Sequence, residues 1–304
     1  MSTVTPLTST MELLRPLKAD RKTQVMAIIN VTPDSFSGGR DTCNLDETLS
    51  EIGTTLKSST VGIIDIGGQS TAPGASSVSA GGEASRAVPL IRRLQSEGVS
   101  SIARDKFAIS IDTYHASVAA EAVEAGADII NDVTAGVMDP DMLPTMARLG
   151  KTVVLMHMRG DPSTMSQLTD YPGGLIPTIA SELLSRIEAA EQAGIRRWRI
   201  ILDPGIGFAK TGDQNLEVLR RFDELRNWPG LRGFPWLIGS SRKNFIGEIT
   251  GVKEPKQRLM GTSATVAAAI FGGADVVRVH DAEKMVQVAK MSDAIWRVSP
   301  NAFK

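Results

Sequence analysis

Val25-Met-Ala-Ile-Ile-Asn-Val31 is the first of eight short apolar runs that decide the fold of this chain. Each run is too short for a helix, and valine and isoleucine dominate, as is typical of strands. The apolar residues are continuous instead of alternating, which indicates burial on both faces, as in a parallel sheet. The other seven runs are Val61–Ile66, Phe107–Ile111, Asp128–Val133, Thr152–Met158, Trp198–Leu202, Pro235–Gly239 and Asp275–Val279.

Amphipathic stretches with helical periodicity separate these runs. Strand–helix units repeated eight times in 304 residues predict an α/β fold, a single (β/α)8 TIM barrel with its active site at the C-terminal ends of the strands. An open doubly wound sheet is the alternative, but no Gly-x-Gly-x-x-Gly turn follows the first run. The clearest helical stretches are Asp46–Leu56, Glu83–Gln95, Ala116–Ala125, Ile179–Ala193, Gln214–Arg226, Gln257–Phe271 and Ala282–Trp296.

The composition excludes several classes of protein. With 33 Lys+Arg against 34 Asp+Glu the net charge is -1, which argues against a nucleic-acid partner held by bulk charge. No apolar run reaches the length of a membrane span, so we expect no membrane partner. The one cysteine, Cys43, excludes an internal disulfide and a cysteine zinc cage, and indicates a reducing compartment.

We expect residues 1–24 to be a flexible leader and residues 25–304 to be one barrel domain, because no low-complexity linker divides the chain. The leader is rich in serine and threonine, but Glu12 and Asp20 argue against an organellar presequence. The expected location is therefore cytoplasmic, with the mitochondrion as the alternative.

Polar or charged side chains follow every one of the eight runs. A single aspartate at a strand end is more often a cap or turn residue than a functional one. Eight polar strand ends meeting at one rim are harder to explain by capping, and they predict a site there. The residues at these ends include Asn30, Asp65, Asp112, Asn131, Asp132, His157, Asp203, Ser241, Arg242, Lys243, Arg278, His280 and Asp281.

The rim residues fall into two chemical groups. One group, Asp112, Asn131, Asp203 and Lys243, accepts and donates hydrogen bonds in a pattern suited to a flat heterocycle. The second group suits an anion, since the loops after strands seven and eight form the usual phosphate site of this fold. Its members are Asn30, Ser241, Arg242, Arg278 and His280.

Plainer interpretations stay open for some of these residues. Arg242 is a candidate surface charge, and His157 a candidate core histidine. Asp132 and Asp281 are candidate caps of the following helices, and His115 is a candidate surface or capping residue.

The strand-end motifs, taken together, resemble the dihydropteroate synthase family of folate biosynthesis. They occur in the family's order and cover roughly residues 25–297. Their residues are more similar to those of eukaryotic, fungal-like members than to those of other members. The matching pieces are Asn30-Val-Thr-Pro-Asp-Ser-Phe-Ser37, Asp65-Ile-Gly-Gly68, Ser110-Ile-Asp-Thr113, Ile130-Asn-Asp132, Met156-His-Met158, Leu202-Asp-Pro-Gly205, Ser241-Arg-Lys243 and Arg278-Val-His-Asp281.

The resemblance implies a transferase reaction. A hydroxymethyl dihydropterin pyrophosphate would lose pyrophosphate, and the amine of p-aminobenzoate would attack the resulting cationic carbon to give 7,8-dihydropteroate. It also implies a magnesium cofactor, a homodimer joined through the last two helical stretches, and a sulfonamide target.

Residue roles follow from the same resemblance. The catalytic residues would be Asp34, Asp112 and Lys243. The pterin would be bound by Asp112, Asn131, Met158, Asp203, Lys243 and Arg278. Pyrophosphate would be bound by Asn30, Arg278 and His280, with Mg²⁺ at Asn30. The p-aminobenzoate slot would be lined by Phe36, Thr71, Pro73, Phe208 and Ser241.

Three positions depart from the family pattern. Ala72 stands where an arginine usually follows Ser-Thr, Gly38 where an aspartate is common, and His115 where a lysine or arginine is common. A missing charge-assisted contact at Ala72 is worth about 1.5–3 kcal/mol, or about 10- to 150-fold in rate. Two alternatives therefore stand beside the synthase: a weakly active or inactive pterin-binding paralogue, and a pterin-dependent methyl transfer module. The latter leaves Ser241-Arg-Lys243, Arg278 and His280 unexplained.

Overall fold

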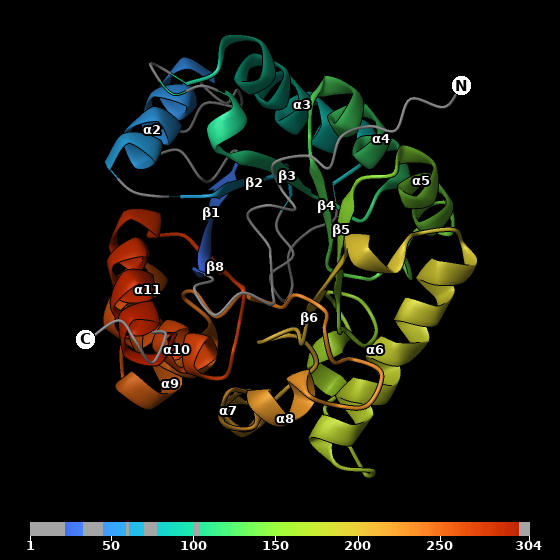
Figure 1. Cartoon of the computed structure of the whole chain (residues 1–304), viewed down its shortest axis with the longest axis vertical. Helices are drawn as coiled ribbons and strands as arrows, with labels where there is room; N and C mark the ends of the chain where they lie inside the picture. Colours follow the sequence, from blue (N-terminus) through green and yellow to red (C-terminus); the bar gives the residue numbers. More distant parts are fainter. Residues whose placement is uncertain are drawn as a thin grey trace, which may run out of the picture.

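A ring of eight parallel strands forms the centre of the molecule (Figure 1). The computed structural model describes residues 22–32, 45–58, 61–69, 78–99, 102 and 104–297. Its strands match the eight predicted runs to within two residues at every end. They are β1 (Gln24–Asn30), β2 (Ile63–Gly67), β3 (Ala108–Asp112), β4 (Ile129–Asp132), β5 (Thr152–Met156), β6 (Ile200–Asp203), β7 (Leu237–Ile238) and β8 (Val276–Val279).

The strand order establishes a barrel. Neighbouring strands run β6-β5-β4-β3-β2-β1-β8-β7, and every pairing is parallel. A parallel bridge between Leu202 and Trp236 joins the two ends of this series. The Leu202 amide also donates to the carbonyl of Pro235 at 2.9 Å. The TIM-barrel prediction is therefore confirmed, and the open doubly wound alternative is wrong.

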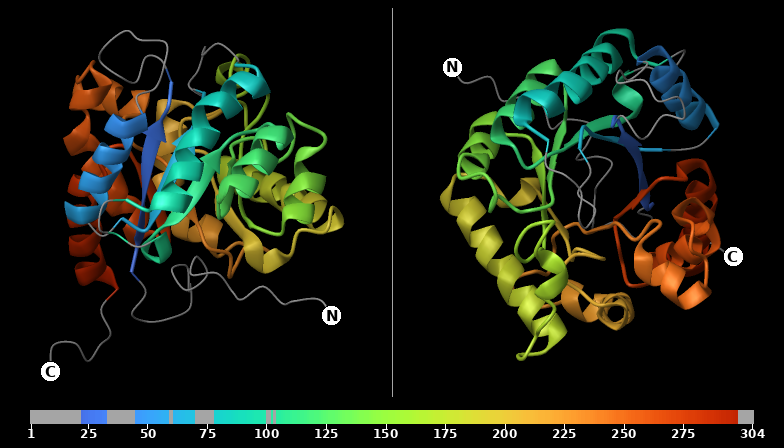
Figure 2. Two further views of the ribbon diagram at one scale, coloured as in Figure 1. Left: turned by 90° about the horizontal axis from the view of Figure 1, so that it is seen from above. Right: turned by 180° about the vertical axis from the view of Figure 1, so that it is seen from behind.

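Helices surround the ring, as both views in Figure 2 show. The predicted stretch 214–226 is two helices, because the chain leaves helical geometry at Arg221 and Phe222 turns inward to pack edge-on against Trp236. The short helices α5 and α9 were not predicted. The helices are α2 (Leu45–Ser58), α3 (Ala80–Glu97), α4 (Ala116–Ala125), α5 (Met142–Leu149), α6 (Leu175–Gln192), α7 (Gly212–Arg220), α8 (Phe222–Arg226), α9 (Asn244–Thr250), α10 (Leu259–Phe271) and α11 (Ala282–Trp296).

Each strand contributes one buried apolar residue to a cluster inside the barrel. The residues between and beside these positions belong to a second cluster beneath the helices. Since side chains alternate along a strand, positions two and four residues beyond the inner cluster also face the barrel axis. The inner cluster is Met26, Ile63, Ala108, Ile129, Val154, Ile201, Leu237 and Val276.

Eight of the rim residues, together with Met158, occupy these inward positions. Two residues beyond the inner cluster stand Asp65, Asn131, Asp203 and Arg278, and four residues beyond it stand Asn30, Asp112, Met158, Ser241 and His280. The apolar cluster is thus the floor of a polar cup at the C-terminal ends of the strands.

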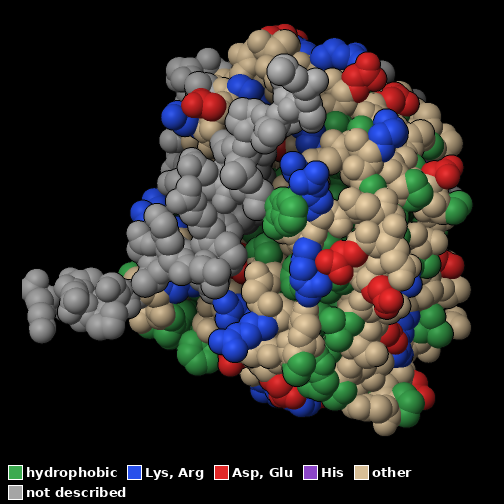
Figure 3. Space-filling model, turned by 45° about the vertical axis from the view of Figure 1, so that its right-hand side comes forward, with side chains coloured by type: hydrophobic (Ala, Val, Ile, Leu, Met, Phe, Trp, Pro, Cys, Tyr) green, Lys and Arg blue, Asp and Glu red, His purple; other side chains and the backbone are tan. Residues whose placement is uncertain are grey.

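The outer surface carries charges of both signs. Figure 3 shows blue and red side chains interspersed over the described part of one face, with apolar side chains between them. Among the described helices, none combines the length and the apolar character that a membrane crossing needs.

Candidate active site

Arg278, on β8, holds the centre of the cup. Its Nε donates to Asp65 on β2 at 2.6 Å, and its Nη2 donates to Asp112 on β3. Asn131 on β4 donates to the same Asp65 oxygen at 3.2 Å. Asp65 is fully buried, so its charge needs such a partner. The guanidinium therefore ties three neighbouring parts of the barrel wall together.

Asp112 keeps one side of its carboxylate free for a ligand. Its Oδ1 atom is buried and has no hydrogen-bond partner in the described part of the chain. Burial raises the pKa of Asp112 to about 7, although the charge of Arg278 opposes this shift. A buried acceptor without a partner is costly, and a ligand N–H group would satisfy it.

Asp203 and Lys243 stand on the opposite wall. The amide of Gly205 donates to Asp203 at 2.7 Å, and burial raises the pKa of this carboxylate to about 6. Burial and the charge of Arg278 lower the pKa of Lys243 to about 8. The Lys243 ammonium lies 4.1 Å from the centre of the Phe208 ring, a cation–π contact. Carboxylates, amide and lysine thus converge on one space.

His280 and Ser241 form a second polar pair at the rim. Ser241 Oγ lies 3.0 Å from His280 Nδ1 and also accepts from the His280 amide. Burial lowers the pKa of His280 to about 3, with Arg242, Arg278 and Lys243 adding to the shift. His280 is therefore a neutral imidazole at physiological pH, surrounded by cations that favour an anionic ligand.

The plainer interpretations resolve differently for each residue. Arg242 is not a free surface charge, since it pairs with Asp281 at 3.0 Å. Asp281 occupies the N-cap position of α11 without a side-chain cap bond, so the cap interpretation is wrong for its side chain. Asp132 accepts from the Thr134 and Gly136 amides in a turn, well before α5. His157 is a satisfied buried histidine.

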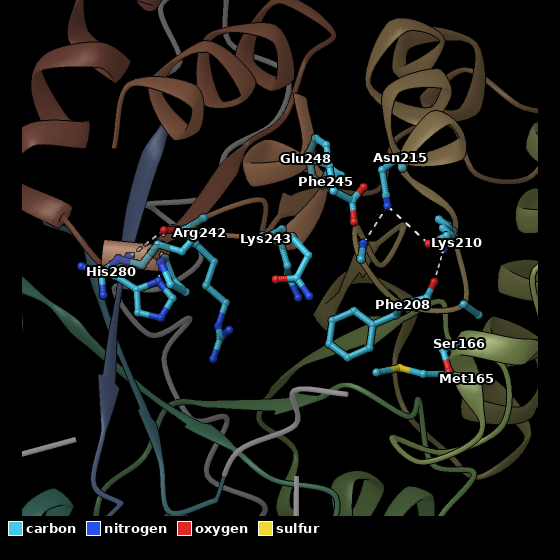
Figure 4. A pocket seen from close by; sticks show the side chains of 18 of the residues that line it. Met165, Ser166, Phe208, Lys210, Asn215, Arg242, Lys243, Phe245, Glu248 and His280 are labelled. Atoms are coloured by element: carbon cyan, nitrogen blue, oxygen red, sulfur yellow. Dashed lines mark hydrogen bonds between the residues drawn. The ribbon is translucent and has the colours of Figure 1, made fainter. Parts of the chain in front are cut away.

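These groups surround a cavity of about 780 Å³. Figure 4 shows Arg242, Lys243 and His280 on one side of it and Phe208 and Met165 on the other. Of the predicted site residues, the cavity is lined by Asn30, Asp112, Phe208, Ser241, Lys243, Arg278 and His280.

The remaining predicted residues divide into two sets. Asn131 and Asp203 do not line this cavity: Asn131 donates to the buried Asp65, and Asp203 accepts from the Gly205 amide. Met158 lines a smaller cavity of about 210 Å³. The other predicted site residues, Asp34, Phe36, Thr71 and Pro73, lie outside the described residues. So do two of the three departures from the family pattern, Gly38 and Ala72.

A buried network that the sequence did not predict lies where the loop after β2 begins. Gln69 donates to Glu83 at 3.1 Å and accepts from the Tyr114 hydroxyl at 3.0 Å. Glu83 also meets His115 Nδ1 at 2.7 Å, so His115 is a partner of a buried carboxylate and makes no side-chain cap. Burial raises the pKa of Glu83. The sequence signal that could have predicted this network is Glu83 itself, a glutamate on the buried face of α3.

A resident metal centre has no protein cage in the described part of the chain. No three His, Cys, Asp or Glu side chains gather there closely enough to hold an ion. Asn30, which lines the cavity, offers one amide oxygen. Magnesium often binds through one or two protein oxygens together with substrate phosphates, so this donor fits an ion that arrives with a phosphate group.

Sequence comparison places the chain among known enzymes. The family model described as "Pterin binding enzyme" matches residues 26–280. The dihydropteroate synthase of Synechocystis is 45% identical over 91% of both chains. The folic acid synthesis protein fol1 of Pneumocystis carinii is 46% identical over 90% of this chain, which spans only 36% of that longer protein.

Solved structures agree with the sequence relatives. Dihydropteroate synthase from Clostridium difficile, solved in the presence of pteroic acid, is 39% identical, with a TM-score of 0.82 over 92% of this chain and 98% of that one. The enzyme from Xanthomonas albilineans, solved with 4-aminobenzoic acid, is 36% identical, with a TM-score of 0.81 over 92% and 95%. The chain therefore belongs to the pterin-binding enzymes and, within them, to the dihydropteroate synthases of folate synthesis.

Proposed function

We propose that this cup joins 6-hydroxymethyl-7,8-dihydropterin pyrophosphate to p-aminobenzoate, releasing pyrophosphate and forming 7,8-dihydropteroate. The observation that carries the proposal is the wall of Asp112, Asn131, Asp203 and Lys243 standing beside the cations around His280. One half of the site suits the pterin ring, and the other suits a leaving group that gains negative charge.

At the pterin end, buried carboxylates accept hydrogen bonds from the N–H groups of the ring. Asp112 Oδ1 is the open acceptor on one wall, and Asp203 is the acceptor on the other. Lys243 donates to the carbonyl edge of the ring. Asn131 supplies an amide, and Met158 together with the Arg278 guanidinium supplies flat contacts. As the exocyclic carbon becomes cationic, the carboxylate of Asp112 stabilises the developing positive charge, and Asp34 is proposed to do the same.

At the pyrophosphate end, cations stabilise the departing charge. Arg278 and His280 donate hydrogen bonds to the phosphate oxygens, and Asn30 gives the oxygen that would hold Mg²⁺. When bound, the ion neutralises part of the leaving-group charge. His280 is neutral before the anion arrives, and a bound anion raises its pKa.

The arylamine needs orientation more than acid–base help, because an aromatic amine is already nucleophilic at neutral pH. Its ring is proposed to lie against Phe208, with its carboxylate at Ser241 and with Phe36, Thr71 and Pro73 completing the slot. Positioning of this kind raises the rate by converting an encounter between two molecules into a step within one complex.

The direct test is synthesis by the purified chain. Incubation with the pterin pyrophosphate, p-aminobenzoate and Mg²⁺ should release pyrophosphate and yield dihydropteroate in equal amounts. Tight pterin binding without turnover would instead support the inactive paralogue, and methyl transfer from methyltetrahydrofolate would support the methyl transfer module. Neither alternative is favoured by the known relatives.

The rate should depend on pH in a bell shape. On the acid side, kcat/KM for the pterin pyrophosphate falls below about pH 7, because Asp112 and then Asp203, with pKa values of about 7 and about 6, become protonated and stop accepting. On the alkaline side it falls above about pH 8, where Lys243 loses its proton. Steady-state rates across this range test the prediction. A profile that stays flat from about pH 5 to about pH 9 would contradict it.

We also propose a homodimer joined through the outer faces of α10 and α11. Large apolar side chains are exposed there, including Met260 at 79% and Phe271 at 69%, and Phe271 packs edge-on against Trp296. Exposed apolar patches of this kind mark interaction surfaces. We expect light scattering to report a dimer, and the double variant Met260→Lys, Phe271→Glu to be a monomer. Val137→Glu, at an apolar position elsewhere that is 58% exposed, is the control and should stay dimeric.

The proposed compartment is the cytoplasm, with the mitochondrion as the alternative. A chain with one cysteine gains nothing from an oxidising environment, which supports a reducing one. Fractionation of cells that carry the tagged chain distinguishes the two compartments.

A further inference from the structure

Lys210, in the loop after β6, is buried among backbone oxygens. Its Nζ lies 2.9 Å from His157 Nδ1, 3.1 Å from the carbonyl of Gly205 and 3.1 Å from the carbonyl of Phe208. An ammonium group has three N–H donors, and three acceptors surround this one. The protonated form of Lys210 therefore makes every hydrogen bond that the position offers.

His157 connects Lys210 to Glu182 on α6. Its Nε2 lies 2.7 Å from Glu182, which also binds Arg159 at 2.6 Å. Burial, together with the charge of Lys210, lowers the pKa of His157 to about 4, so the ring is neutral. The neutral ring accepts from Lys210 at Nδ1 and donates to Glu182 at Nε2, which connects the lysine to a carboxylate on α6.

The turn that Lys210 holds has an irregular backbone. Residues 205–209 lie outside the strands and helices, and φ is positive at Gly205, Gly207 and Ala209. A Cβ atom at Gly205 would come within 2.0 Å of the His157 carbonyl, so only glycine fits there. A non-glycine residue such as Ala209, with φ of 47°, needs its surroundings to hold it. Side chains must therefore fix this turn.

Those side chains come from three directions. Lys210 binds two carbonyls, the Tyr171 hydroxyl donates to the carbonyl of Ala209 at 2.8 Å, and Asn215 accepts from the Gly207 amide at 2.7 Å. Phe208 closes the turn, since its amide donates to the carbonyl of Gly205 at 3.1 Å. Figure 4 shows its ring projecting into the cavity, with Lys210 on the side of Phe208 away from Lys243.

We propose that Lys210 is a positioning residue for the arylamine: its ammonium group fixes the turn 205–208 so that the Phe208 ring and Lys243 form one wall of the slot. The proposal rests on the proposed function, which places p-aminobenzoate against Phe208. It assigns to Lys210 a larger effect on the arylamine than on the pterin, since Lys210 hydrogen-bonds the turn and acts on Asp203 only through its charge.

The same geometry predicts a pH effect. Burial lowers the pKa of Lys210 to about 7. The facing groups act in both directions, since Asp203 and Glu182 raise this pKa whereas Arg159 and Lys243 lower it. Loss of the proton removes one donor from the turn, so KM for p-aminobenzoate should rise as the pH rises above about 7. The Lys210→Arg variant keeps its charge throughout, so its KM for p-aminobenzoate should not rise as the pH passes about 7 and should begin to rise only where Lys243 titrates, near pH 8.

The test is a two-substrate kinetic comparison. Lys210→Met should raise KM for p-aminobenzoate by about 10-fold or more, as expected for loss of a charged hydrogen bond, and leave KM for the pterin pyrophosphate within about threefold. Tyr171→Phe, which removes one neutral bond from the same turn, should shift the same KM by about threefold. Lys106→Met is the matched control, because Lys106 is 69% exposed and precedes β3 at the opposite end of the barrel.

The outcomes separate the two proposals. A wild-type chain that makes no dihydropteroate overturns the proposed function itself. An active wild type whose Lys210→Met variant keeps its KM for p-aminobenzoate, or loses both substrates equally, overturns only the role of Lys210. If Lys210→Met does not fold, Tyr171→Phe and the pH profile of Lys210→Arg decide: an unchanged KM in the first and a wild-type pH dependence in the second would each overturn it.

Discussion

Replacing Arg278 with methionine should abolish synthesis of dihydropteroate and lower the free energy of unfolding by about 3–5 kcal/mol. The guanidinium is the shared partner of Asp65 and Asp112, and Asp65 is fully buried. Removing it leaves two carboxylates close together in the barrel without their cation. Urea denaturation at neutral pH measures the loss of stability, and the synthase assay measures the loss of activity.

The loss of stability in the Arg278→Met variant should depend on pH in a definite direction. Unpaired buried carboxylates have raised pKa values in the folded state, so they destabilise it most where they are ionised in the unfolded chain. The stability difference from wild type should therefore shrink as the pH falls from about 8 to about 5. Arg242→Met is the matched control, since its pair with Asp281 is more exposed on the carboxylate side and should be worth about 1 kcal/mol or less. Equal losses in the two variants would contradict the central role of Arg278.

The sequence predicted the strands better than it predicted their faces. Every run became a strand near its expected position, because a continuous apolar run needs burial on both sides. Because these runs are apolar throughout, the sequence does not show which side chains face the barrel axis. Asp65 lies in an apolar run, and its partner Arg278 is 213 residues away, so no local pattern joins them. The observed alternation behind the inner apolar cluster identifies both as residues of the cup.

The limits of the sequence elsewhere have physical causes too. Helices α5 and α9 have eight and seven residues, which is too short for a clear helical period, and Pro144 interrupts the pattern of α5. The sequence did not predict the buried position of Lys210, because a lysine in a loop is usually a surface charge. Its function depends on three backbone and ring acceptors that only the folded turn brings together.

Asp203→Asn is expected to have opposite effects on binding and stability. Pterin affinity, measured by calorimetry, should fall by about 10- to 150-fold, because a charged acceptor becomes a neutral one. The free energy of unfolding should rise by about 1–3 kcal/mol at alkaline pH. Burial raises the pKa of Asp203 to about 6 from its ordinary 3.8, so the ionised form that binds pterin is disfavoured in the folded protein. Asparagine keeps an oxygen for the Gly205 amide without that charge.

The sign can be checked against pH. A group whose folded pKa is raised favours the folded state at low pH, and this contribution is lost as the pH rises through the folded value, here about 6. The gain from asparagine should accordingly be absent near pH 4 and complete near pH 8. Asp203→Ala is the control, since it removes the charge and also the acceptor for Gly205, and it should lose affinity without gaining stability. A gain that is the same at both pH values would mean that the charge of Asp203 is not what destabilises the fold. A gain confined to high pH would mean that the cup maintains an unfavourable carboxylate because the pterin requires it.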